Sequence, residues 1–166
     1  MKYVLTTVWH IDAPVDSVWA VIYSPQQWPQ WWKGALGVTE LEKGDALGVG
    51  GRYRFLWKGR LPYTLMFECR VTRVAPLQAL EGIASGELEG YGRWLFFRAG
   101  VTSIVRYEWC VGVTRPWMRL LSPVAHPLFK WNHDILMRDG GVGLSRLLNA
   151  RLIACASSGR ISDRES

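Results

Sequence analysis

His133 is the titratable side chain that the sequence alone places on an apolar surface. It lies in a segment, 127–156, whose apolar residues recur at helical spacing, and a wheel at about 100° per residue puts it in the middle of the apolar sector. An imidazole there could donate a hydrogen bond that orients the carbonyl or phenol of a ligand, or could transfer a proton as a general acid or base. The alternative is a core histidine that bonds to a buried tyrosine or to a backbone carbonyl group.

Aromatic side chains form a second candidate, because they alternate with charged residues along several short segments. Arg52 and Arg54 flank Tyr53, for example, and Arg106 and Glu108 flank Tyr107. In a strand this alternation puts the rings on one face of a sheet and the charges on the other, where we expect solvated pairs. The apolar face predicted in this way comprises Phe55, Trp57, Leu65, Phe67, Trp94, Phe96, Tyr107 and Trp109.

This apolar face is either a packed core or the wall of a ligand cavity. Tryptophan and tyrosine carry an N–H or O–H group that needs a partner when buried, and a ligand could supply that partner. The chain has ten tryptophans, six tyrosines and five phenylalanines, which exceeds what the packing of 166 residues demands. Tyr107 is the second candidate for proton transfer beside His133, although the pattern by itself identifies no catalytic residue.

Three glycines, Gly140, Gly141 and Gly143, interrupt the predicted long helix between Met137 and Leu144, which share its apolar sector. Each glycine costs about 1 kcal/mol relative to alanine, so we expect a compensating reason for it. The glycines either kink the helix, or let sheet residues or a ligand approach its backbone, or break the helix at this point. The predicted ligand-binding set therefore adds His133, Met137, Gly140 and Leu144 to the sheet residues.

The sequence lacks the motifs of several enzyme classes. It has no H-E-x-x-H, C-x-x-C, G-x-S-x-G or G-x-x-x-x-G-K-[ST] pattern, and the glycines at 48, 50 and 51 lack the spacing of a dinucleotide loop. The three cysteines and three histidines are spread over separate segments, which argues against a metal site. We therefore expect no metal, no nucleotide cofactor and no covalent serine or cysteine chemistry.

Charge and hydropathy argue against nucleic-acid-binding proteins and membrane-spanning proteins. The net charge of +6 comes from 20 basic and 14 acidic residues, and the basic residues are scattered singly, so we expect no nucleic-acid binding. No uncharged run reaches the ~20 apolar residues that span a bilayer, and the first residues lack a signal-peptide pattern. The sequence therefore predicts a cytoplasmic globular protein without stable membrane insertion, and it does not indicate the oligomeric state.

Local patterns predict the elements that position these candidates. Residues 3–12 alternate like a strand, and two short helices follow, one after Pro14 and one after Ser24-Pro25. Residues 36–113 are typical of an antiparallel meander, and a long helix is expected over 127–156. We expect an α+β domain at 1–156, in which a curved sheet of about seven strands wraps around the long helix, followed by a disordered tail at 157–166.

Four motifs, in this order, carry a resemblance to a known family. They are Ala13-Pro14-x-x-x-Val18-Trp19, Trp28-Pro29-x-Trp31, Val105-x-Tyr107-x-Trp109, and Met137 ahead of Gly143-Leu144. Together with the predicted layout they resemble the START-like SRPBCC superfamily, in its polyketide cyclase/dehydrase branch, over residues 1 to about 155. The resemblance implies a helix-grip fold that encloses a deep pocket for an apolar or aromatic small molecule. Relatives include aromatic polyketide cyclases, coenzyme-Q-binding proteins, lipid-transfer domains and plant hormone or allergen proteins.

Members of this family share the cavity and not the chemistry, so three functions stay open. The first is binding of a hydrophobic or aromatic small molecule, such as a lipid, a quinone or a polyketide-like molecule, between the sheet and the C-terminal helix. The second is a cyclase or dehydratase that uses the same cavity, in which His133 with Tyr107 moves a proton. The third is an interaction module that presents a tryptophan-rich surface to a protein or a membrane.

Overall fold

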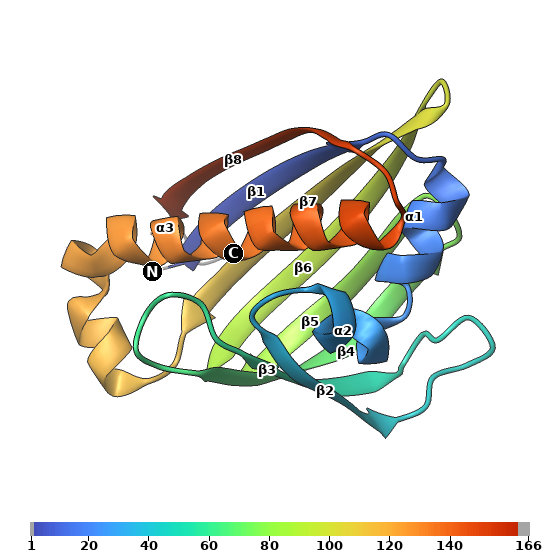
Figure 1. Ribbon diagram of the computed structural model, residues 1–166. Helices are drawn as coiled ribbons and strands as arrows, with labels where there is room; N and C mark the ends of the chain where they lie inside the picture. The colour runs from blue at the N-terminus through green and yellow to red at the C-terminus, as the bar shows by residue number, and fades with distance from the viewer. Residues whose placement is uncertain (1, 163–166) are drawn as a thin grey trace.

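The computed structural model describes residues 2–162, with the side chains of 119 and 121–125 excepted. Eight strands form one antiparallel sheet in the order β2-β3-β4-β5-β6-β7-β1-β8. The strands are β1 (Lys2–Ile11), β2 (Ala35–Glu42), β3 (Arg52–Trp57), β4 (Leu65–Ala75), β5 (Ala79–Gly86), β6 (Leu88–Ala99), β7 (Thr102–Val113) and β8 (Leu152–Ser162). The sheet is curved and unclosed, and the helices lie on its concave side (Figure 1). The predicted α+β helix-grip fold is confirmed, with eight strands instead of about seven.

The two faces of the sheet differ as the alternation predicts. Every second residue of β1 is buried, from Tyr3 to Ile11. On the outer face, Arg54 pairs with Glu68 at 2.9 Å, and an oxygen of Glu108 accepts from Arg106 at 2.8 Å. Such partly exposed pairs add little to stability, so the burial of the inner face is what holds the strands in this register.

Four helical elements of the described residues lie on the inner face of the sheet. α1 (Val15–Ile22) buries the four residues of its apolar stripe, Val15, Val18, Trp19 and Ile22. A short 3₁₀ turn, η1 (Pro25–Gln27), leads into α2 (Trp28–Trp31). The long helix α3 (Pro116–Leu147) crosses the concave side of the sheet, as Figure 1 shows. Within the described residues, none of the helices is long and apolar enough to cross a membrane.

The prediction that the long helix spans 127–156 is wrong at both ends. α3 begins at Pro116, whose fixed φ suits the first turn of a helix. The helix then continues through Pro127, with a bend near its start that Figure 1 shows. A proline inside a helix removes one hydrogen bond and bends the axis without ending the helix, when packing compensates for the loss.

The C-terminal end of α3 is set by a hydrogen-bonding motif that helical periodicity does not detect. Asn149 adopts the left-handed conformation, with φ at 49°. Its N–H donates to the carbonyl of Arg146 at 3.1 Å, and the N–H of Ala150 donates to the carbonyl of Ser145 at 2.8 Å. This is the Schellman arrangement, which ends a helix and turns the chain away.

The chain after this turn forms β8, an edge strand that pairs antiparallel with β1. The expected disordered tail at 157–166 is therefore wrong for Ser157 to Ser162, and the domain boundary expected at 156 falls inside a strand. Residues 163–166 lie outside the described residues. The serine-rich composition is misleading because β1 supplies the backbone partners, and the hydroxyls of Thr7 and Ser157 lie 3.0 Å apart.

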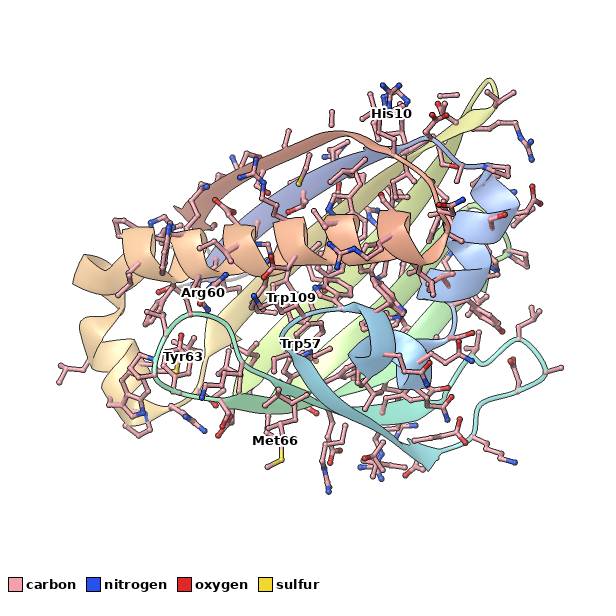
Figure 2. All side chains as sticks on the ribbon, in the orientation of Figure 1. His10, Trp57, Arg60, Tyr63, Met66 and Trp109 are labelled. Atoms are coloured by element: carbon pink, nitrogen blue, oxygen red, sulfur yellow. The ribbon has the colours of Figure 1, made fainter. Side chains whose placement is uncertain are left out.

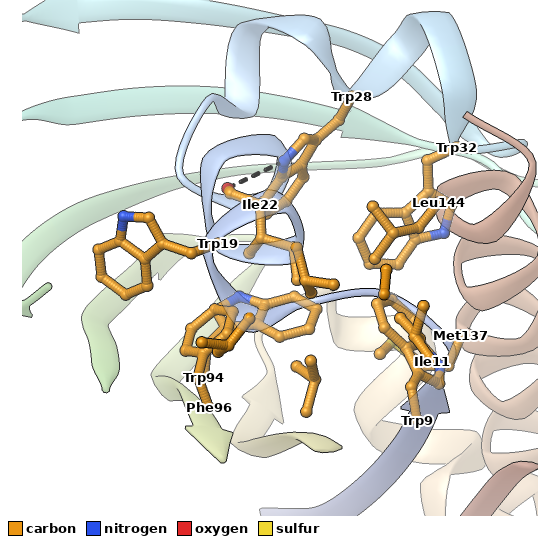
Figure 3. Close-up of a cluster of buried hydrophobic side chains, with 14 of the residues drawn as sticks. Trp9, Ile11, Trp19, Ile22, Trp28, Trp32, Trp94, Phe96, Met137 and Leu144 are labelled. Atoms are coloured by element: carbon orange, nitrogen blue, oxygen red, sulfur yellow. Dashed lines mark hydrogen bonds between the residues drawn. The ribbon is translucent and has the colours of Figure 1, made fainter. Parts of the chain in front are cut away.

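The larger hydrophobic cluster contains five buried tryptophans among its residues (Figure 3). Trp9 from β1, Trp28 and Trp32 from and beside α2, and Trp94 from β6 pack with ring centroids 5.2 to 6.2 Å apart. Trp28 donates its indole N–H to the carbonyl of Ile22 at 3.2 Å. Aromatic pairs at such distances add specific attraction to their area burial.

The three glycines of α3 lie where these rings approach the helix. A methyl group on Gly140 would come within 2.7 Å of the indole nitrogen of Trp32, and one on Gly141 within 3.0 Å of that of Trp9. A methyl group on Gly143 would overlap the backbone carbonyl of Trp31. Of the alternatives open from the sequence, close approach of other protein residues is therefore the one that the structure shows, and the helix continues through all three positions.

Candidate functional site: an aromatic cavity under the long helix

A cavity of about 490 Å³ lies between the inner face of the sheet and α3. Its wall takes residues from β3 to β7, from α2 and from the middle of α3, so segments far apart in sequence form it together. Nine of the predicted ligand-binding residues line it: Phe55, Trp57, Leu65, Phe67, Trp94, Tyr107, Trp109, His133 and Met137. Figure 2 shows Trp57 and Trp109 between the sheet and α3, whereas Met66, the neighbour of Leu65, points away on the opposite side of the sheet.

The other three predicted residues, Phe96, Gly140 and Leu144, lie in the packed core and not in the cavity wall. Phe96 contacts Trp19 of α1, with ring centroids 4.9 Å apart. Gly140 contacts the indole of Trp32, and Leu144 is completely buried. The reason is common to all three: α1 and α2 fill this end of the concave face, and alternation along a strand or helix cannot show where another element fills the space.

Sequence reasoning missed several residues of the wall. Trp28 of α2 and Trp32, directly after α2, line the cavity, as do Tyr63 of the loop after β3 and Phe129 of α3. The two tryptophans could have been predicted, because tryptophans at 28, 31 and 32 have the spacing of one helical turn with a buried face. Tyr63 lies in the loop after β3, where no periodicity exists to predict its direction.

The loop that carries Tyr63 is tied to α3 by one buried amide. Asn132 accepts hydrogen bonds through its Oδ1 from the backbone N–H of Arg60, at 2.7 Å, and of Leu61, at 3.3 Å. The Asn132 side chain also fills the space above Gly59, where any methyl group would overlap it. These contacts hold the loop against the helix and thereby close one side of the cavity.

The wall includes the phenols of Tyr107 and Tyr63 and the thiol of Cys69. Burial raises the pKa of Tyr107 well above its ordinary value, and Cys69 adds to that shift. Burial likewise raises the pKa of Cys69 to about 11 and that of Tyr63 to about 12. At neutral pH all three therefore keep their protons, and they offer hydrogen-bond donors without charge.

His133 contributes the titratable side chain of the helical wall. Both of its ring nitrogens are buried, and neither has a hydrogen-bond partner among the described residues. Its Nδ1 lies 3.7 Å from Oδ1 of Asp134, whose other oxygen accepts from Lys130 at 2.5 Å. Burial opposes ionisation of Asp134, but His133 and Lys130 beside it outweigh burial and lower its pKa. Among the described residues, His133 thus has Asp134 as its acidic neighbour, and no hydrogen bond joins it to a tyrosine or to a backbone carbonyl group.

The wall carries no arrangement typical of a metal centre. Among the residues with described side chains, no group of three or more His, Cys, Asp or Glu is placed to hold a metal ion. Cys69, Cys110 and Cys155 are free thiols on three different strands. What the arrangement can do is enclose an apolar molecule, stack on it and donate neutral hydrogen bonds to it.

The sequence matches the model of one protein family. This family is described as polyketide cyclase / dehydrase and lipid transport, and the match covers residues 3–139. The matched range ends within α3, so β8 lies beyond it. Among curated proteins, none matches the chain significantly.

Several solved structures have the same fold. A START superfamily protein from Mycobacterium smegmatis superposes with a TM-score of 0.72 at 13% identity, over 89% of this chain and 97% of that one. The Zhui aromatase/cyclase from Streptomyces sp. R1128 gives 0.63 at 12% identity, over 89% and 96%. A norcoclaurine synthase from Thalictrum flavum gives 0.59 at 16% identity, over 90% and 95%. At such low identity these likenesses establish the fold alone.

Proposed function

This chain belongs to the polyketide cyclase / dehydrase and lipid transport family, and on that premise we propose that it binds an apolar or aromatic small molecule in the cavity under α3. The observation that carries the proposal is the cavity itself, about 490 Å³ in volume and walled mainly by aromatic and aliphatic side chains. Sites for small organic molecules typically have volumes of about 300–1,000 Å³ and a similar mixture of rings and few polar groups. A lipid, a quinone or a polyketide-like molecule has the required chemistry.

The energetics favour a neutral, largely apolar ligand. Burial of apolar surface contributes roughly 25 cal/mol per Å², so most of the affinity would come from the rings. Tyr63, Cys69 and Tyr107 keep their protons at neutral pH, so they orient a ligand through hydrogen bonds and offer no charge to neutralise an ion.

A cyclase or dehydratase that uses the same cavity is the second candidate, and His133 favours it. An imidazole with two unpartnered nitrogens in the wall is available to accept a proton from a substrate carbon beside a carbonyl group. Tyr107, from the opposite wall, could donate a hydrogen bond to the carbonyl oxygen on which charge then develops. The shaped pocket would supply the proximity on which such a cyclisation depends.

The third reading, a tryptophan-rich interaction surface, has less support. Six of the ten tryptophans are buried, and Trp31 and Trp57 are partly buried. The exposed ones are Trp117 and Trp131 on α3, at 43% and 48% of their surface. Most of the tryptophans thus lie inside the protein, where a ligand in the cavity could contact them.

Native mass spectrometry of freshly purified protein, followed by solvent extraction, tests for a ligand that copurifies. The companion experiment titrates the protein with N-phenyl-1-naphthylamine, a neutral aromatic fluorophore. We expect saturable binding that Leu65→Trp weakens about tenfold or more, because the added ring fills the cavity. Met66→Trp is the matched control, since Met66 is the next residue of β4 and lies on the outer face. Equal binding by both folded variants would refute the proposal.

His133→Ala separates binding from catalysis. A variant that binds normally and loses turnover of an offered polyketone favours the enzyme, whereas a variant that only loses affinity favours the binding protein. The fold of each variant is checked by circular dichroism, so that misfolding is not mistaken for loss of function.

A further inference from the structure

Two glycines form a hollow in the inner face of the sheet. Gly82 of β5 and Gly92 of β6 are directly opposite one another in the antiparallel register. Both line the cavity, on a face where the neighbouring inward positions carry large side chains such as Trp94 and Trp109. Neither glycine has a positive φ, so the backbone does not require glycine there and the reason must be space.

The space is taken by side chains from the flanking strands, two of which are polar. A methyl group on Gly82 would lie 2.5 Å from Sγ of Cys69, which comes from β4. A methyl group on Gly92 would lie 2.7 Å from the ring of Trp109 and 3.0 Å from the hydroxyl oxygen of Tyr107, both of which come from β7. In the strand order β4-β5-β6-β7, the thiol and the phenol therefore approach the glycine pair from opposite sides.

The tyrosine ring is held firmly in this position. It packs against Trp94 with ring centroids 4.2 Å apart and against Trp109 at 5.8 Å. A ring clamped between two indoles cannot turn its hydroxyl elsewhere, so the direction of the O–H group is set before any ligand arrives. Among the described residues, no hydrogen bond engages the Tyr107 hydroxyl or the Cys69 thiol.

We propose that the Tyr107 hydroxyl and the Cys69 thiol, set over Gly82 and Gly92, are the polar anchor of the cavity and bind the carbonyl oxygen of a flat, apolar ketone or quinone. The inference rests on the proposed binding function and names the ligand class. A carbonyl oxygen has two lone pairs and can accept from both donors at once. Both donors are buried in an apolar wall, where an unmade hydrogen bond is costly, so a ligand that supplies an acceptor is favoured over one that does not.

The test compares two probes that share one tricyclic skeleton, 9-fluorenone and fluorene, which differ by a carbonyl oxygen. We expect wild-type protein to bind fluorenone more tightly, by about three- to tenfold, in a titration followed by tryptophan fluorescence. Tyr107→Phe is expected to remove most of this preference for fluorenone, because Cys69 is then the only donor left of the pair. The control Tyr91→Phe removes a hydroxyl from the outer face beside Gly92 and leaves the preference intact.

A spectroscopic readout makes the test independent of affinity. The carbonyl stretching band of bound fluorenone lies at lower frequency in wild type than in Tyr107→Phe, because a hydrogen bond weakens the C=O bond. If Tyr107→Phe does not fold, Cys69→Ala removes the second donor, with a smaller loss of preference because a thiol is a weak donor.

The outcomes separate the two proposals. If wild type binds both probes equally, or if Tyr107→Phe retains the preference, the anchor is refuted and the binding function stands. If neither probe binds saturably, the binding function itself fails and the anchor fails with it.

Discussion

Trp32, beside α2, donates a hydrogen bond from its indole Nε1 to the backbone carbonyl of Leu136 in α3, at 2.8 Å. Both residues line the cavity, so this bond sets how far α2 stands from the helix. Gly140, one turn further along α3, leaves room for the same indole. The width of the site therefore depends on a contact between segments more than 100 positions apart in the chain.

Gly140→Ala is expected to destabilise the protein, although alanine is the better helix former by about 1 kcal/mol. The new methyl group would overlap the Trp32 indole, and overpacking of this kind costs typically about 1–3 kcal/mol. Urea unfolding gives the free energy of unfolding. Val142→Ala, at a half-exposed position of the same helix, is the control and changes it by less than about 0.5 kcal/mol. A stabilised Gly140→Ala protein would show that α2 does not pack as described.

Asn132→Ala is expected to release the loop between β3 and β4. The loss leaves the backbone N–H groups of Arg60 and Leu61 without their acceptor, at a cost of about 1–3 kcal/mol. Limited trypsin digestion measures the release, since Lys58 and Arg60 are cleavage sites in this loop. Asn132→Asp keeps an acceptor oxygen, so its loop should stay largely resistant to trypsin. Equal cleavage of the two variants would contradict the role of the amide oxygen.

Stability is expected to fall at alkaline pH because of Cys69. Its pKa is about 11 in the folded protein against 9.0 as the ordinary value. Between these values the unfolded chain loses the thiol proton first, so the free energy of unfolding decreases as pH rises from about 9 to 11, by at most about 3 kcal/mol. Below pH 9 the contribution is fully present.

Urea unfolding at pH 8, 9, 10 and 11 measures this loss in wild type and in Cys69→Ala. The variant lacks the pH-dependent contribution of the Cys69 thiol, so its free energy of unfolding falls less steeply with pH than that of wild type. Cys110→Ala, which removes a thiol from a different strand, is the control for thiol removal itself. Parallel curves for wild type and Cys69→Ala would argue against a buried, neutral thiol.

Removal of β8 is expected to destabilise β1. A chain that ends at Asn149 loses the whole partner strand and the contact between Thr7 and Ser157, and it uncovers the buried edge of Trp9 opposite Cys155. Thermal unfolding followed by circular dichroism should show a clear loss of stability. A chain that ends at Ser162 keeps β8 complete and retains the wild-type transition; if both truncations behave alike, β8 contributes nothing to the fold.

Acrylamide quenching is expected to reach few of the tryptophans. Trp117 and Trp131 are the exposed ones, so Trp117→Phe/Trp131→Phe removes most of the quenchable fluorescence. Strong quenching that persists in the double variant would mean that the interior rings are open to solvent, and it would favour the interaction-surface reading over an enclosed cavity.

Local patterns were sufficient for the parts of the fold that repeat along the chain. Alternation of rings and charges placed Phe67, Trp94 and Tyr107 on the inner face, because a side chain of a strand can point to only one of two faces. Helical spacing likewise identified the apolar stripe of α3 around His133 and Met137. These assignments do not depend on which elements pack against each face, because the backbone geometry of a strand or helix alone decides which side chains share a face.

Long-range packing was needed for the rest. Phe96 and Leu144 have the same local pattern as the cavity residues, but α1 and α2 bury them. The end of α3 at Asn149 and the pairing of β8 depend on hydrogen bonds, not on hydropathy, and the hollow over Gly82 and Gly92 exists because the register makes these glycines neighbours. A cavity is the volume that packing leaves unfilled, so it is a property of all the surrounding elements together and of none of them alone.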